Sequence, residues 1–97
     1  MERIKKVEII TTSLELDKVL DTLNSLNVSG YSVIRNVIGK GGRGIADDDI
    51  EMSVLSNVYV MTTCPPEDVE KLVDRIRPIL KKFGGVCLVS DAEWIIH

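Results

Sequence analysis

Hydrophobic and polar residues alternate along the first part of the chain and then recur at helical spacing. Residues 3–12 (RIKKVEIITT) alternate in the manner of a β-strand. Thr12 and Glu15 then have the spacing of a capping box at the start of a helix, with Ser13 as an alternative cap. The helix runs to about residue 26, because five apolar residues fall on one helical face: Leu16, Val19, Leu20, Leu23 and Leu26.

A second helix is predicted within residues 64–85. Pro65 or Pro66 suits its first turn, where a missing backbone N–H has no consequence, and Gly84 and Gly85 end it. Its apolar stripe consists of Val69, Leu72, Val73, Ile76, Leu80 and Phe83.

Three further strands complete the pattern. Residues 31–38 (YSVIRNVI) and 55–63 (LSNVYVMTT) are β-rich, and residues 86–97 predict a last strand with a short apolar tail. The order is β-α-β followed by β-α-β, which predicts an α+β ferredoxin-like fold: a four-stranded antiparallel sheet with both helices on one face. With 97 residues, the chain is expected to form a single domain, 1–97.

The predicted sheet has more apolar surface than two helices on one face can cover. The second strand is apolar on both sides, with Val33 and Val37 on one and Ile34 and Ile38 on the other. The fourth strand is similar, with Cys87 and Val89 alternating with Val86 and Leu88. An apolar face without a helix needs another protein surface, so we expect a homo-oligomer that packs through its sheets.

Composition and charge exclude several classes. The net charge of -3 argues against a nucleic-acid binder, which carries a basic face. No apolar run approaches the roughly 20 residues that span a bilayer, and the first ten residues do not resemble a signal peptide. Cys64 and Cys87 lack metal-site spacing and are expected to be packed thiols in a reducing compartment. These features predict a cytoplasmic protein.

The segment between the second and third strands carries the most unusual composition. Residues 39–44 (GKGGRG) could be a flexible hairpin loop, or a cradle in which backbone N–H groups, Lys40 and Arg43 bind an anion. The spacing fits neither a P-loop nor a dinucleotide fingerprint. Residues 47–51 (DDDIE) could be a solvated acidic tip or a cation site, although they lack an EF-hand pattern. No set of catalytic or metal-ligating residues can be assembled, so we do not expect an enzyme.

Two stretches of the sequence resemble those of a known protein family. The sequence GYSVIRNVIGKGGRG after the first helix and FGGVCLVSDAEWI after the second resemble the PII signalling superfamily over nearly the whole chain. The strand start Gly-Tyr-Ser-Val and the glycine-rich basic stretch after it are most similar to the PII-like branch that includes the carboxysome-associated and SbtB-type regulators.

The resemblance implies a homotrimer whose sheets face inward, with an adenine nucleotide in each cleft between subunits. It implies that residues 39–54 are a T-loop that docks on a membrane transporter or an enzyme. The implied nucleotide-binding residues are Ser32, Gly39, Lys40, Gly41, Arg43, Met61, Thr62, Thr63, Gly84, Gly85 and Val89. No metal and no obligatory cofactor are implied.

Departures from the family pattern bear on the ligand. Gly44 stands where PII proteins have the glutamine that serves Mg²⁺ and 2-oxoglutarate, and Val86 follows the glycines of the second turn where a lysine is usual. The C-terminal arginines are also absent. Each missing cation removes a charge-assisted bond to a terminal phosphate, so AMP, ADP or cyclic AMP is expected rather than Mg-ATP with 2-oxoglutarate.

Other readings of the same fold stay open on sequence grounds. A CutA-like trimer would need metal ligands at its cleft, and an ACT-like amino-acid binder would favour a dimer. A small dimeric α+β isomerase would need an acid–base residue in a closed pocket. Oligomeric state and a turnover screen would separate these from a nucleotide sensor.

Overall fold

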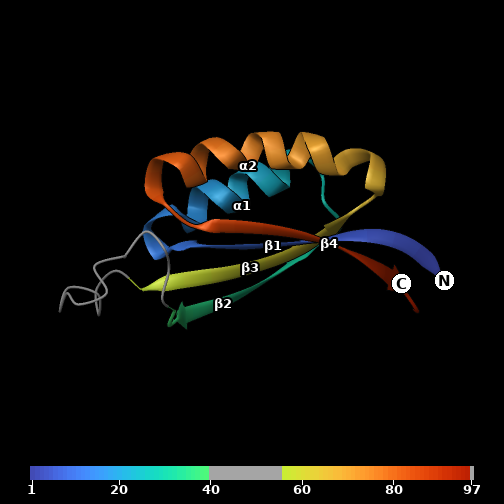
Figure 1. The fold of residues 1–97 in the computed structure, drawn as a ribbon, viewed down its shortest axis with the longest axis horizontal. Coiled ribbons are helices and arrows are strands. Elements are labelled where there is room, and N and C mark those ends of the chain that lie inside the picture. Colours follow the sequence, from blue (N-terminus) through green and yellow to red (C-terminus); the bar gives the residue numbers. More distant parts are fainter. Residues whose placement is uncertain (40–55, 97) are drawn as a thin grey trace.

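The computed structural model describes residues 1–39 and 56–96, which form one antiparallel sheet with two helices on one face (Figure 1). The elements in chain order are β1 (Glu2–Thr12), the 3₁₀ turn η1 (Ser13–Glu15), α1 (Leu16–Ser25), β2 (Tyr31–Val37), β3 (Asn57–Cys64), the 3₁₀ turn η3 (Pro66–Asp68), α2 (Val69–Phe83) and β4 (Val86–Trp94). The strand order is β2-β3-β1-β4. The predicted ferredoxin-like fold is confirmed.

The core lies between the helices and the sheet. It is built from the apolar stripes that the helical spacing predicts and from alternate residues of the two central strands. Its buried members are Val7, Ile9, Leu16, Val19, Leu23, Val58, Val60, Cys64, Leu72 and Ile76. Each fully buried aliphatic side chain contributes about 1.5–3 kcal/mol relative to an exposed one. This layer therefore fixes the sheet against α1 and α2.

The predicted capping box at the start of the first helix is wrong. Thr12 makes no side-chain cap hydrogen bond, and the three residues after it form a 3₁₀ turn before α1 begins at Leu16. Glu15 is buried instead of reaching back to Thr12, and its Oε1 lies 3.5 Å from Lys18 Nζ. The tight 3₁₀ turn removes the helical geometry that a capping box requires.

The faces predicted for the second strand also need correction. A register shift falls between Arg35 and Val37, and Asn36 adopts a positive φ of 60°. The extra residue at this β-bulge changes the alternation, so Val37 pairs with Asn57 and does not share the helix-covered face of Val33. The signal for this was weak, because only the tolerance of asparagine for positive φ marks the position.

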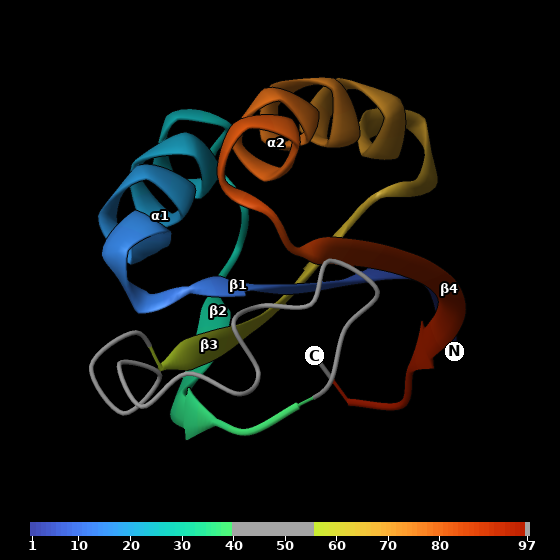
Figure 2. The ribbon, with the colours of Figure 1, turned by 60° about the vertical axis from the view of Figure 1, so that its left-hand side comes forward.

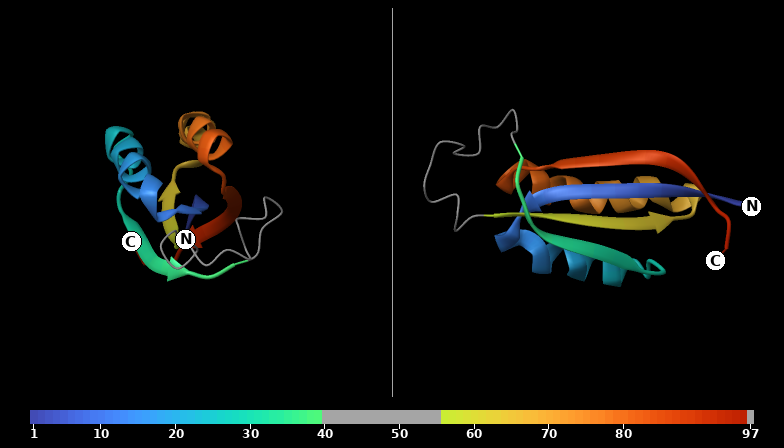
Figure 3. Two further views of the ribbon diagram at one scale, coloured as in Figure 1. Left: turned by 90° about the vertical axis from the view of Figure 1, so that its left-hand side faces the viewer. Right: turned by 90° about the horizontal axis from the view of Figure 1, so that it is seen from below.

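The second face of the sheet carries no helix (Figure 3). We call this the open face. Ile34, Val86 and Leu88 lie on it with 57%, 50% and 58% of their surface exposed. Between them, Tyr59 donates a hydrogen bond to Glu8 Oε2 at 2.5 Å, which raises the pKa of Tyr59. The expected apolar surface is therefore present, with one polar pair near its middle.

Candidate functional site

One end of the sheet gathers the glycine-rich segments. The end of β2 and the start of β3 lie at the same end of the sheet as the turn between α2 and β4 (Figures 1 and 2). Two hydrogen bonds of 2.8 Å hold this end together: Ser13 N–H donates to the Ser56 carbonyl, and Thr11 Oγ1 donates to the Gly84 carbonyl. The end of β1 thus joins both loops.

The turn after α2 depends on its two glycines. Gly84 has φ 88° and Gly85 has φ 132°, conformations that side chains rarely adopt. A Cβ on Gly85 would clash with the Ile10 carbonyl and would lie 3.0 Å from Leu80 Cδ2. This turn therefore keeps its backbone close to β1.

A second group of predicted residues lies across β2 and β3. Ser32 pairs with Met61, and both lie on the open face together with Thr63. Thr62 points the other way: its side chain is buried and its Oγ1 donates to the Gly30 carbonyl at 2.6 Å. Thr62 thereby holds the start of β2 in place, while its neighbours remain accessible.

Val89 lies far from this group within one chain. It belongs to β4, at the opposite edge of the sheet from β2, and 43% of its surface is exposed. Three strand spacings separate the two edges, which is about 14 Å. One chain therefore brings Gly39, Gly84 and Gly85 to one end of the sheet and leaves Ser32 and Val89 on opposite edges.

Three of the predicted residues, Lys40, Gly41 and Arg43, lie outside the described residues. The same holds for the acidic residues 47–51. Their roles stay predictions.

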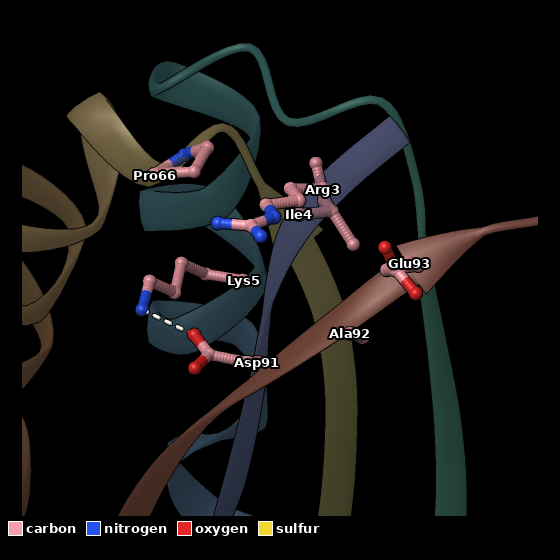
Figure 4. A pocket seen from close by; sticks show the side chains of 7 residues that line it. All are labelled: Arg3, Ile4, Lys5, Pro66, Asp91, Ala92 and Glu93. Atoms are coloured by element: carbon pink, nitrogen blue, oxygen red, sulfur yellow. Dashed lines mark hydrogen bonds and ion pairs between the residues drawn. The ribbon is translucent and has the colours of Figure 1, made fainter. Parts of the chain in front are cut away.

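A hollow of about 640 Å³ that sequence reasoning missed lies at the other end of the sheet (Figure 4). Residues of opposite charge face each other across β1 and β4 there, with Arg3 opposite Glu93 and Lys5 opposite Asp91. Lys5 Nζ contacts Asp91 Oδ1, and this contact lowers the pKa of Asp91. The hollow has balanced charge and wide exposure, so it has no preference for an anion.

Metal and thiol chemistry have little support in the described part of the chain. Residues 1–39 and 56–96 contain no group of three or more histidine, cysteine or acidic residues that could hold a metal ion. Cys64 and Cys87 are free and packed, as predicted, and burial raises the pKa of both thiols. None of the described helices is long and apolar enough to cross a membrane.

The strand order and the two helices on one face define the class of ferredoxin-like α+β domains with a double β-α-β sheet. Residues 4–96 match the family model described as nitrogen regulatory protein P-II, and the chain belongs to this family. A search of curated proteins by sequence found no match.

Solved structures match almost the whole chain. One match is CPII, a nitrogen regulatory PII-like protein from Thiomonas intermedia K12 that was solved with ADP, AMP and bicarbonate. It superposes with a TM-score of 0.82 at 25% identity, and the match covers 98% of this chain and 96% of that chain. Its apo form gives a TM-score of 0.80 at 25% identity, covering 95% and 91%. A putative PII-like signalling protein from Thermus thermophilus shares the fold with a TM-score of 0.76 at 21% identity, covering 97% and 91%.

These matches decide several of the alternatives. The chain is a PII-like regulatory protein, as the resemblance implied, and family membership argues against the CutA-like, ACT-like and isomerase readings. The resemblance to the SbtB-type branch is compatible with the CPII matches and continues to rest on the Gly-Tyr-Ser-Val and glycine-rich motifs.

Proposed function

We propose that residues 1–97 form one PII-like domain that assembles as a homotrimer and binds ADP or AMP in the clefts between subunits. The protein acts without catalysis and regulates a transporter or an enzyme through its T-loop-like segment, residues 39–54. The observation that carries the proposal is the match to CPII, which is bound to ADP and AMP and which the chain covers almost completely.

The geometry of the predicted site supports a cleft between subunits. Ser32 and Met61 lie near one edge of the sheet, and Val89 and Gly85 lie at the other. A nucleotide that touches both groups needs two chains, placed with the β2 edge of one beside the β4 edge of the next. An adenine base would lie against the apolar residues, and the phosphates would lie toward the glycine turns.

Replacing Leu88 with lysine should break the trimer. Leu88 lies on the open face directly opposite Glu8 of β1, so a lysine there can pair with a carboxylate in the isolated chain. In a trimer that buries this face, the charge would lose its hydration and disfavour assembly. Native mass spectrometry should show trimers for the wild type and monomers for Leu88→Lys.

Leu14→Lys is the matched control for this experiment. Leu14 is also an exposed leucine, but it lies in the η1 turn outside the sheet. The control variant should remain trimeric. A Leu88→Lys protein that assembles like the wild type would exclude packing through the open face.

ADP and AMP should bind the wild-type protein with heat measurable by calorimetry. Arg43→Ala should weaken this binding about tenfold or more, because a charge-assisted hydrogen bond to phosphate contributes about 1.5–3 kcal/mol. Saturating ADP should also protect the bonds after Lys40 and Arg43 from trypsin, since a ligand shifts a segment only toward the state it binds better. Calorimetry without heat for either nucleotide would overturn the proposal. Bicarbonate belongs in the same titrations, because CPII was solved with it.

A further inference from the structure

A groove of about 320 Å³ runs between α2 and β4, beside the glycine turn. On the helix side it is formed by positions 73, 76, 77, 80 and 81, whose spacing places them on one face of α2. The lining residues are Val73, Ile76, Arg77, Leu80, Lys81, Gly85, Cys87 and Val89. Gly85 and Val89, both predicted to bind nucleotide, therefore share this groove with two cations.

The charge along this part of α2 has one sign. Residues 75–82 (RIRPILKK) contain four basic residues and no acidic one. Of these four, Arg77 and Lys81 line the groove, one helical turn apart, and none of the described residues that line it is acidic. The groove therefore combines two cations with an apolar wall, in which a charge interaction is stronger than in water.

Both cations are available to a ligand. Arg77 Nη1 lies 3.4 Å from Asp74 Oδ1, but both side chains are more than half exposed, and such surface pairs contribute little. Among the described residues, Lys81 pairs with no carboxylate. Burial raises the pKa of Cys87, which also lines the groove, and the nearby positive charge of Arg77 opposes this rise.

We propose that Arg77 and Lys81 bind the phosphate groups of the adenine nucleotide in this groove. The proposal rests on the nucleotide-binding function proposed above. The glycine turn itself offers no cation, since Val86 follows Gly85 directly. Two α2 side chains that line the same groove supply positive charge beside this turn.

The alternative is that Arg77 and Lys81 are only solvent-exposed side chains of an amphipathic helix and interact favourably with its C-terminal dipole. Lys82 provides the comparison, because it is equally close to the helix end but does not line the groove. Its Nζ lies 5.3 Å from the centre of the Phe83 ring. Arg75 provides a second, since its guanidinium donates to Ser25 Oγ of α1 at 3.2 Å. If the groove binds phosphate, replacing Arg77 or Lys81 should weaken nucleotide binding, and replacing Lys82 or Arg75 should not.

The experiment titrates ADP, AMP and adenosine against the wild type, Arg77→Gln, Lys81→Gln, Lys82→Gln and Arg75→Gln. Arg77→Gln and Lys81→Gln should each weaken ADP binding about tenfold, and adenosine binding should stay unchanged because adenosine has no phosphate. The two control variants should retain wild-type affinity for ADP. The salt dependence of ADP binding should also be shallower in Arg77→Gln and Lys81→Gln, because fewer charges are neutralised.

The outcomes separate this inference from the function beneath it. If the wild type binds ADP and both groove variants bind it equally well, the inference is overturned and the proposed function stands. If all four variants weaken ADP binding equally, the effect is general helix charge and the groove assignment is overturned. If the wild type binds neither ADP nor AMP, the function and the inference fail together.

Discussion

Gly85→Ala should be about 2–6 kcal/mol less stable than the wild type. The added Cβ clashes with the Ile10 carbonyl and lies 3.1 Å from Thr11 Cβ, and the backbone φ of 132° is strained for any side chain. A strained backbone conformation costs about 1–3 kcal/mol, and overpacking costs a similar amount. Urea unfolding at a fixed protein concentration measures the difference, since assembly adds to the apparent stability.

Gly30→Ala is the matched control. No heavy atom lies within 4 Å of a Cβ built at Gly30, and alanine keeps the carbonyl that accepts the Thr62 hydrogen bond. Its stability should differ from the wild type by less than about 1 kcal/mol. Equal stability of the two alanine variants would show that the turn relaxes around Gly85. The close approach of this turn to β1 would then contribute nothing to the free energy of unfolding.

Leu23→Ala should destabilise the protein by about 2–5 kcal/mol through the cavity it leaves. Leu23 is fully buried in the core between α1 and the sheet. The midpoint of urea unfolding should fall while the slope of the transition stays the same, because the surface exposed on unfolding hardly changes.

Leu14→Ala removes the same atoms from an exposed site. Leu14 is 70% exposed, so its truncation should change the free energy of unfolding by no more than about 0.5 kcal/mol. The contrast between the two variants tests whether the α1 stripe seen in the sequence is the energetic core. Similar losses at both positions would contradict that assignment.

Much of the fold could be predicted because its signals are local. Leucine spacing defined α1, the glycine pair ended α2, and alternation placed the strands, all of which depend on backbone periods of 3.6 and 2. The capping box failed because spacing alone does not show whether the first turn is α-helical or 3₁₀. The β-bulge at Asn36 was missed because one extra residue leaves the β-rich composition of a strand unchanged.

The site was predictable only in part. Family resemblance pointed to the glycine segments, and the structure places the described ones together at one end of the sheet. The groove cations were not predicted, because the sequence pattern places Lys81 among the basic residues usual at a helix end and Arg77 on a solvent-exposed helix face. The signal that was available is their spacing of four residues within a stretch that has no acidic residue. The proposed cleft between sheet edges depends on contacts with a second chain. Such contacts leave no pattern that can be recognised in a single sequence.

The bulge at Asn36 also sets the side of the sheet on which Val37 lies. If residues 35–37 alternated regularly, Val37 would turn toward the helices, whereas the bulge keeps it opposite Asn57 on the open face. Deleting Asn36 should therefore leave Val37 opposite Asn57, because these two residues already pair across the bulge. The bulge thus accommodates one extra residue in β2 while the pairing of Tyr31, Val33 and Val37 with β3 is kept.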